Sequence, residues 1–116
     1  MTSPSDKPVF CFTVSVSDSQ DPPIVSCSPP TTTIATADTM IEFNLVTAGY
    51  SFDPATPIVF SQETTDFPYL WPVNATQVMM NDLCSVAANL SFTIKVIENG
   101  SGRSLSHDPI IRNEPT

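Results

Sequence analysis

Three aspartates that each precede a proline have the clearest chemistry in this sequence: Asp21-Pro22, Asp53-Pro54 and Asp108-Pro109. An Asp-Pro bond is weak because the aspartyl carboxyl can attack its own carbonyl carbon through a five-membered ring, and the proline nitrogen leaves well once it is protonated. Rigid positioning of the carboxyl would accelerate that reaction greatly. We interpret the first two pairs as turns, since Asp accepts local backbone hydrogen bonds and Pro fixes φ.

The third pair lies in the C-terminal segment Ser106-His107-Asp108-Pro109-Ile110-Ile111-Arg112-Asn113-Glu114-Pro115, in which a Glu-Pro follows the Asp-Pro at a short distance. This combination in a chain of this size resembles the signature of the small bacterial DP-EP family. The resemblance covers this segment best, reaches back over the strand that carries Lys95, and extends more loosely over the whole chain.

The resemblance implies a β-sandwich that cuts its own chain at the Asp-Pro bond by aspartic-peptidase-like chemistry and can join the aspartate to a lysine. Carried over to this sequence, Asp108 is on the acyl side of the cut and Pro109 is the leaving amine. Lys95 is the amine for the cross-link, and Ser106 is a neighbour within the motif. The resemblance therefore predicts a self-cleaving aspartic-type endopeptidase. We expect the peptide from Pro109 to Thr116 to stay bound as a partner, because Ile110 and Ile111 can be buried on a strand that hydrogen-bonds to a sheet edge.

Cleavage needs a second acid beside Asp108. One carboxyl must hold a proton while another group accepts one, and two acids held together provide that arrangement. Our candidate for the second acid is Asp38, with Glu42 behind it. His107 is adjacent to Asp108, but neighbours in a strand point to opposite faces, so we do not expect a catalytic histidine.

The cross-link requires Lys95 to meet Asp108. The turn signal Asn99-Gly100-Ser101-Gly102 lies between them, so two antiparallel strands can bring them face to face. We expect the Lys95 amine within a few Å of the Asp108 carboxyl. As a nucleophile Lys95 must lose its proton, which burial beside its apolar strand neighbours would favour. The alternative is a lysine that faces solvent from a strand.

A non-catalytic interpretation remains beside the catalytic one. In it the chain is an interaction or structural module, the C-terminal segment is simply the last strand, and Asp108-Pro109 is the turn before that strand. Both hypotheses allow a homo-oligomer. Intact-mass measurement of the denatured protein separates them, because only the first predicts fragments that end at Asp108 and begin at Pro109.

Apolar residues at every second position predict β-strands. The alternation is longest over residues 10–16, 41–45 and 92–96, with shorter candidates at Ile24–Ser28, Pro57–Ser61 and Thr76–Met80. We predict about seven strands in one domain over residues 1–116, an all-β antiparallel β-sandwich of immunoglobulin-like type, with a helical turn only at Asn81–Asn89. The predicted core is Phe10, Phe12, Val14, Ile41, Phe43, Leu45, Phe92, Ile94 and Val96, with Tyr50, Tyr69 and Trp71 as its lid.

Composition excludes several function classes. The 12 acidic and 4 basic side chains give a net charge of −8, which disfavours nucleic acid and anionic membranes because binding there depends on Lys and Arg. One histidine and scattered cysteines cannot form the usual zinc site, and Asp18 and Asp21 lack a third carboxylate for calcium, so we expect no metal and no cofactor. Residues 1–8 contain no apolar run, so we expect no signal peptide or anchor, and a soluble, cytoplasmic protein.

Overall fold

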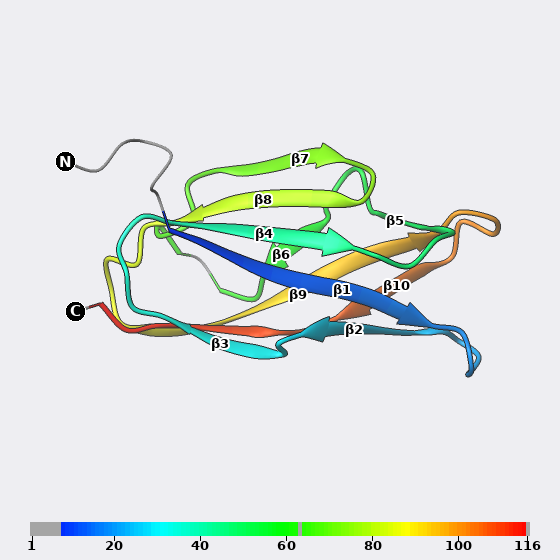
Figure 1. Cartoon of the computed structure of the whole chain (residues 1–116), viewed down its shortest axis with the longest axis horizontal. Coiled ribbons are helices and arrows are strands. Elements are labelled where there is room, and N and C mark those ends of the chain that lie inside the picture. The colour runs from blue at the N-terminus through cyan, green and yellow to red at the C-terminus, as the bar shows by residue number, and fades with distance from the viewer. Residues whose placement is uncertain (1–7, 63, 116) are drawn as a thin grey trace.

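Eleven β-strands form two sheets in the computed structural model, which describes residues 8–62 and 64–115 (Figure 1). These described residues contain no helix, and therefore none that is long and apolar enough to cross a membrane. The all-β class predicted from the alternation is confirmed. The strands are β1 (Val9–Ser17), β2 (Ile24–Ser28), β3 (Thr31–Ile34), β4 (Thr39–Leu45), β5 (Tyr50–Phe52), β6 (Ile58–Phe60), β7 (Leu70–Asn74), β8 (Gln77–Asp82), β9 (Ala88–Glu98), β10 (Ser104–His107) and β11 (Ile110–Asn113).

The two sheets differ in how they are organised. The first has the strand order β2-β1-β4-β8-β7, and Figure 1 shows β7, β8, β4 and β1 side by side. The second is built around the long strand β9. Because Ile94 of β9 pairs with both His107 and Ile58, β10 and β11 run along one edge of β9, and β5 and β6 run along the other. β3 pairs with the outer side of β11.

Two strand pairings are parallel, β1 with β4 and β3 with β11, so the sheets are mixed rather than antiparallel throughout as predicted. A parallel pair needs a long crossover between its strands. Here β2 and β3 lie between β1 and β4 in the chain, and β3 belongs to the second sheet. Side-chain alternation indicates which face of a strand is buried and carries no information on strand direction, which explains the error.

The core lies between the sheets and is centred on three phenylalanines. Phe12 and Phe43 of the first sheet stack with ring centroids 4.9 Å apart, and Phe92 of the second sheet meets Phe43 edge-on at 5.6 Å. The predicted core residues are buried, except that Phe10 is only partly buried. Such aromatic pairs add about 0.5–1.5 kcal/mol beyond the apolar area that they bury.

Other local predictions were wrong. The region Asn81–Asn89 holds no helical turn, since it contains the end of β8, a loop and the start of β9. Tyr50 is buried, but Tyr69 and Trp71 are exposed on β7 and the residue before it, so they do not cover the core. The alternation did not predict four short strands, β3, β5, β7 and β10, which have at most five residues each.

Candidate functional site

Asp108-Pro109 lies inside a strand rather than in a turn. β10 pairs with β9 from Ser104↔Ile97 to His107↔Ile94, and β11 continues from Ile110↔Ser91 to Asn113↔Ala88. The pairing advances one residue at a time across the gap, which sets Asp108 opposite Thr93 and Pro109 opposite Phe92. β10 and β11 are therefore one strand in a single register, interrupted where proline has no N–H to donate.

The Asp108-Pro109 bond is held from both sides while the carboxyl of Asp108 stays exposed. The Thr93 hydroxyl donates to Asp108 Oδ1 at 2.8 Å. Pro109 is buried, and its carbonyl accepts the Phe92 N–H at 3.2 Å. Across the strand, the Ile110 N–H donates to the Pro30 carbonyl at 3.1 Å. The backbone at the bond is thus fixed by its neighbours, and the reactive side chain is positioned by one hydroxyl.

Lys95 and Ser106 share the face of Asp108. Lys95 pairs with Ser106, and Thr93 and Lys95 alternate with the buried residues of β9. Lys95 and Asp108 are consequently diagonal neighbours on the outer face, a spacing that long side chains can span. No ion pair joins them within the described residues, and the contact of the Asp108 carboxyl is with Thr93. Ser106 is exposed, and Lys95 is half-buried.

His107 is directed away from the Asp108 face, as expected from strand alternation. It pairs with the fully buried Ile94, and its Nε2 is buried without a hydrogen-bond partner among the described residues. This imidazole therefore lies on the core side of the second sheet, on the opposite face from the Asp108 carboxyl.

Asp38 lies in the loop that leads into β4 of the first sheet, and it does not contact Asp108. It precedes β4 with a positive φ of 60°, accepts a hydrogen bond from Asn81 Nδ2 at 2.8 Å, and donates its N–H to the Leu83 carbonyl. Glu42 lies on β4, where it accepts hydrogen bonds from Gln77 and Asn44. Neither acid therefore contacts the Asp108 carboxyl. The sequence alone could not show where in the two sheets each acid would lie.

A different pair of acids is buried at the far end of the same strand. Asp66 lies in the loop before β7, Asp82 ends β8 and Asn113 ends β11, and each is at most 3% exposed. The Asn113 amide donates one hydrogen bond to Asp82 Oδ1 at 2.8 Å and another to Asp66 Oδ2 at 3.4 Å. The last strand is therefore tied to two carboxyls that come from other parts of the chain.

The two acids have unequal surroundings. Asp66 also accepts the Ser85 hydroxyl and the backbone N–H groups of Ser85 and Val86, at 3.1 and 3.3 Å. Asp82 has the Cys84 N–H at 2.9 Å on Oδ1, while its Oδ2 is buried without a partner among the described residues. The pKa of Asp82 is raised to about 6, chiefly by burial and to a smaller extent by the nearby Asp66, while the hydrogen bonds from Asn113 and Cys84 lower it. Asp82 therefore takes up a proton at a higher pH than an ordinary aspartate does.

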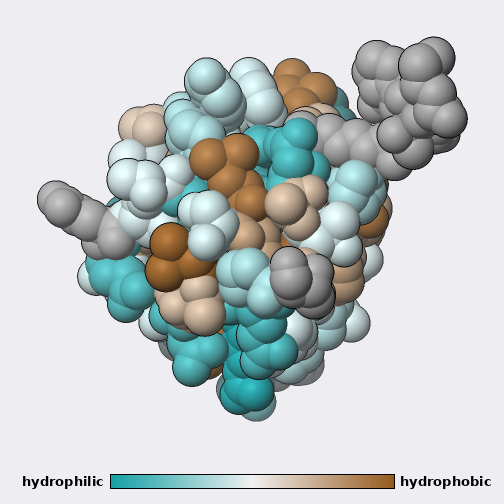
Figure 2. All heavy atoms as spheres, turned by 90° about the vertical axis from the view of Figure 1, so that its left-hand side faces the viewer, coloured by the Kyte–Doolittle hydropathy of each residue, from teal (hydrophilic) through white to brown (hydrophobic). Residues whose placement is uncertain are grey.

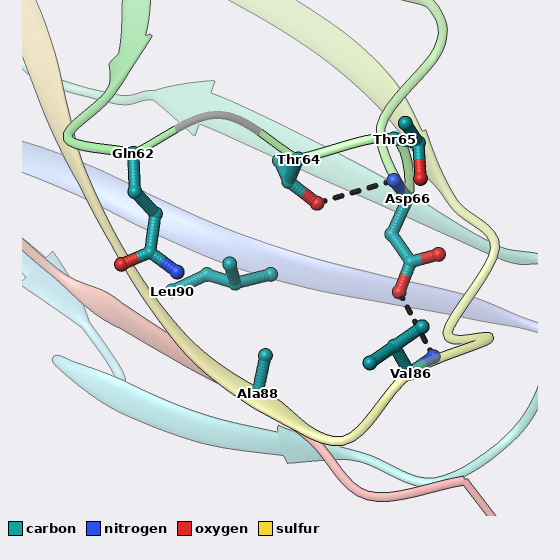
Figure 3. A pocket seen from close by; sticks show the side chains of 7 residues that line it. All are labelled: Gln62, Thr64, Thr65, Asp66, Val86, Ala88 and Leu90. Atoms are coloured by element: carbon teal, nitrogen blue, oxygen red, sulfur yellow. Dashed lines mark hydrogen bonds between the residues drawn. The ribbon is translucent and has the colours of Figure 1, made fainter.

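An open pocket of about 620 Å³ lies beside this cluster. Figure 3 shows Gln62 and Leu90 on one side of it and Asp66 and Val86 on the other, with the Val86 N–H donating to the Asp66 carboxylate. Figure 2 views one end of the molecule, where separate apolar patches lie among hydrophilic side chains. Both Asp66 oxygens already accept hydrogen bonds from the protein, so this carboxylate is not a vacant ligand. Within the described residues no three His, Cys, Asp or Glu side chains gather as a metal site would require.

Sequence reasoning missed Thr93, Asp66, Asp82 and Asn113. A signal existed for two of them, because Asp82 and Asn113 continue the inward positions of their strands two residues after Met80 and Ile111. A polar residue at an inward strand position indicates a buried polar contact. Asp66 lies in a loop and gave no such signal. Comparison of the sequence with protein-family models and with curated proteins finds no match.

Proposed function

We propose that the protein cleaves its own Asp108-Pro109 bond and keeps residues 109–116 bound as a strand of the second sheet. The observation that supports this proposal is the single register of β10 and β11. It fixes the bond between two neighbouring strands, while Thr93 positions the exposed carboxyl of Asp108. Fixing a reactive group next to its target converts a slow local reaction into a favoured one.

The reaction follows from the side chain itself. A carboxylate oxygen of Asp108 attacks the Asp108 carbonyl carbon, the bond to the Pro109 nitrogen breaks, and that nitrogen takes up a proton and leaves as an amine. The product is a cyclic anhydride, which water opens to give Asp108 as a new C-terminus with two carboxyl groups. One water is consumed for each bond broken. The Thr93 hydroxyl orients the carboxyl, and solvent at this exposed face supplies water and proton.

Lys95 offers a second fate for the same anhydride. Lys95 is a diagonal neighbour of Asp108 on the outer face, and its amine, once deprotonated, could attack the anhydride in place of water. A Lys95–Asp108 amide then forms, and the other carboxyl of the opened anhydride stays on Asp108. The backbone register supports this step, because it sets the two residues on one face.

Burial supports retention of the cut segment. Pro109, Ile111 and Asn113 face inward and are buried, and Ile111 is fully enclosed. A fully buried isoleucine contributes about 1.5–3 kcal/mol. β11 also pairs along both edges, with β9 and with β3. These contacts do not depend on the Asp108-Pro109 bond, so they persist when it breaks.

Mass spectrometry under denaturing conditions tests the proposal. We expect two species whose masses correspond to residues 1–108 and 109–116 and together exceed the mass of the full-length chain by one water. A body with a Lys95–Asp108 cross-link would be one water lighter than the hydrolysed body. In the Asp108→Ala variant only the full-length chain should appear. A wild-type chain that remains full-length from acid to alkaline pH contradicts the proposal.

The edge strand β7 favours the non-catalytic alternative, an interaction module. Tyr69 and Trp71 are 60% and 44% exposed, and their rings stack at 5.7 Å with planes 16° apart. Val73 of the same strand is also exposed. Exposed aromatic residues of this kind are enriched where proteins bind one another. An uncut chain that loses a binding partner on Trp71→Ala substitution would support this alternative.

A further inference from the structure

We propose that, after the bond is cut, residues 109–116 can be exchanged between molecules. The strand site, which is the gap between β9 and β3 that β11 leaves, would then bind residues 109–116 of a second copy of this chain. The inference rests on the proposed cleavage, which separates β11 from β10. The required partner is an extended peptide with an apolar residue at the position of Ile111 and an asparagine at the position of Asn113.

The backbone of the site belongs to the body of the protein. β9 pairs antiparallel with one edge of β11, and β3 pairs parallel with the other. The Phe92 N–H, the Pro30 carbonyl and the Ile34 carbonyl hydrogen-bond to the segment at 3.2, 3.1 and 2.9 Å. These three groups remain in place when the segment leaves, and main-chain groups of this kind pair with any strand in the same direction.

Side-chain alternation gives the site its selectivity. Pro109, Ile111 and Asn113 are buried, whereas Arg112 is exposed and Ile110 is only partly buried. The body therefore contacts every second residue of the segment closely. Replacing the fully buried Ile111 by a small polar residue would leave a cavity and an unpaired hydroxyl in the core.

Asn113 is the most specific contact. A carboxamide offers two N–H groups, and Asn113 directs them to Asp82 and Asp66. An aspartate at this position would place a third carboxyl in the same buried cluster. The two acids lie outside β11 and are held by backbone N–H groups of the loop between β8 and β9, so they keep their arrangement without the segment.

An open pocket lies next to the residues that hold the segment. Leu90, which lines the pocket, pairs with Ile111, and Ala88, which also lines it, pairs with Asn113. Asp66, which accepts a hydrogen bond from Asn113, lines the opposite side of the pocket (Figure 3). The residues that hold the C-terminal half of β11 therefore also border open space.

Exchange of a labelled synthetic peptide with the sequence of residues 109–116 tests the inference. Full-length protein, with its cut fraction measured by denaturing mass spectrometry, is incubated with excess peptide, with and without urea below the unfolding transition. Native mass spectrometry then counts bodies that carry the label. We expect labelled bodies among cut molecules only. Peptides with Asn113→Asp or Ile111→Ser should be taken up at least about tenfold less, and the Arg112→Ala peptide should match the native one because Arg112 is exposed.

Cut molecules that take up no label, or that take up the Asn113→Asp peptide equally, overturn the inference. A chain that is never cut contradicts the proposed function instead. In that case exchange is measured on residues 1–108 and 109–116 co-expressed as two chains, which together contain every residue. Failure of these two chains to assemble, or to exchange the peptide once assembled, overturns the strand site independently of self-cleavage.

Discussion

Both ends of the C-terminal strand involve carboxyl groups, and the two ends differ in exposure and in the number of hydrogen bonds. At its start the Asp108 carboxyl is exposed and has one contact, the Thr93 hydroxyl. At its end Asn113 is buried between Asp66 and Asp82, inside a network of backbone donors. The proposed cleavage would therefore separate reactivity from retention along one strand, with the reactive carboxyl at the exposed end and the retaining contacts at the buried end.

Substitution of Pro109 by alanine should have the largest effect, which is the loss of cleavage at the exposed end of the strand. Alanine removes the weak tertiary amide and restores an N–H opposite Phe92, so β10 and β11 become one uninterrupted strand. Cleavage should fall below detection in denaturing mass spectrometry. Pro54→Ala is the matched control and should leave cleavage unchanged, because the Asp53 carboxyl accepts the N–H groups of Ala55 and Thr56 in a turn. Persistent cutting of Pro109→Ala chains would show that the Asp-Pro chemistry is not the cause.

Substitution of Asn113 by leucine tests the buried end. It leaves the carboxyls of Asp66 and Asp82 without their shared donor, and losing a hydrogen bond to a charged group costs about 1.5–3 kcal/mol of unfolding free energy. Urea denaturation in the uncut Asp108→Ala background measures this loss. Arg112→Ala, exposed in the same strand, should change stability by less than about 0.5 kcal/mol. Equal losses of stability in the two variants would contradict the view that Asn113 contributes more to stability than the exposed Arg112.

Acid should strengthen the buried end. The folded protein raises the pKa of Asp82 from 3.8 to about 6, so the folded state binds this proton more tightly than the unfolded chain does. Stability therefore increases as pH falls from about 7 to about 4, by up to about 3 kcal/mol at about 1.4 kcal/mol per pH unit. The difference between wild type and Asp82→Asn, measured by urea denaturation at each pH, isolates this contribution. Parallel pH profiles for the two proteins would contradict it.

Thr93→Val should give the smallest effect and sharpens the account of the exposed end. Valine keeps the shape of threonine on the strand and removes the hydroxyl that donates to Asp108. Loss of one hydrogen bond to a charged group corresponds to a cleavage rate about tenfold lower. The time course of fragment appearance measures the rate. Thr13→Val, on the outer face of β1 in the other sheet, is the control and should cleave at the wild-type rate.

The alternation of apolar residues predicted the long strands because burial of one face is a local property of the chain. β1, β4 and β9 follow that pattern, and Ile24–Ser28 has the bounds that were predicted for it. Parallel pairing was not predictable, since it depends on where the chain crosses between sheets.

The candidate site was predictable only in part. The turn at Asn99–Gly102 predicted two antiparallel strands that would set Lys95 and Asp108 face to face. β9 and β10 do pair antiparallel, with Ser106 rather than Asp108 opposite Lys95. Asp38 was chosen as the second acid without knowledge of its place in the fold, and it lies in the loop before β4 of the other sheet. The Asp66–Asp82–Asn113 cluster joins a loop to the ends of two strands. No local sequence pattern predicts a contact between residues so far apart in the chain.

The single register across Asp108-Pro109 makes the folding history of a molecule matter. An uncut chain closes β10 and β11 onto β9 as one intramolecular event. A cut chain that unfolds becomes two molecules, so its recovery is bimolecular and depends on protein concentration. Dilution should therefore have no effect on the refolding of uncut chains and should slow that of cut ones. Under the proposed cleavage, the first folding of each molecule is the only one that proceeds without a partner.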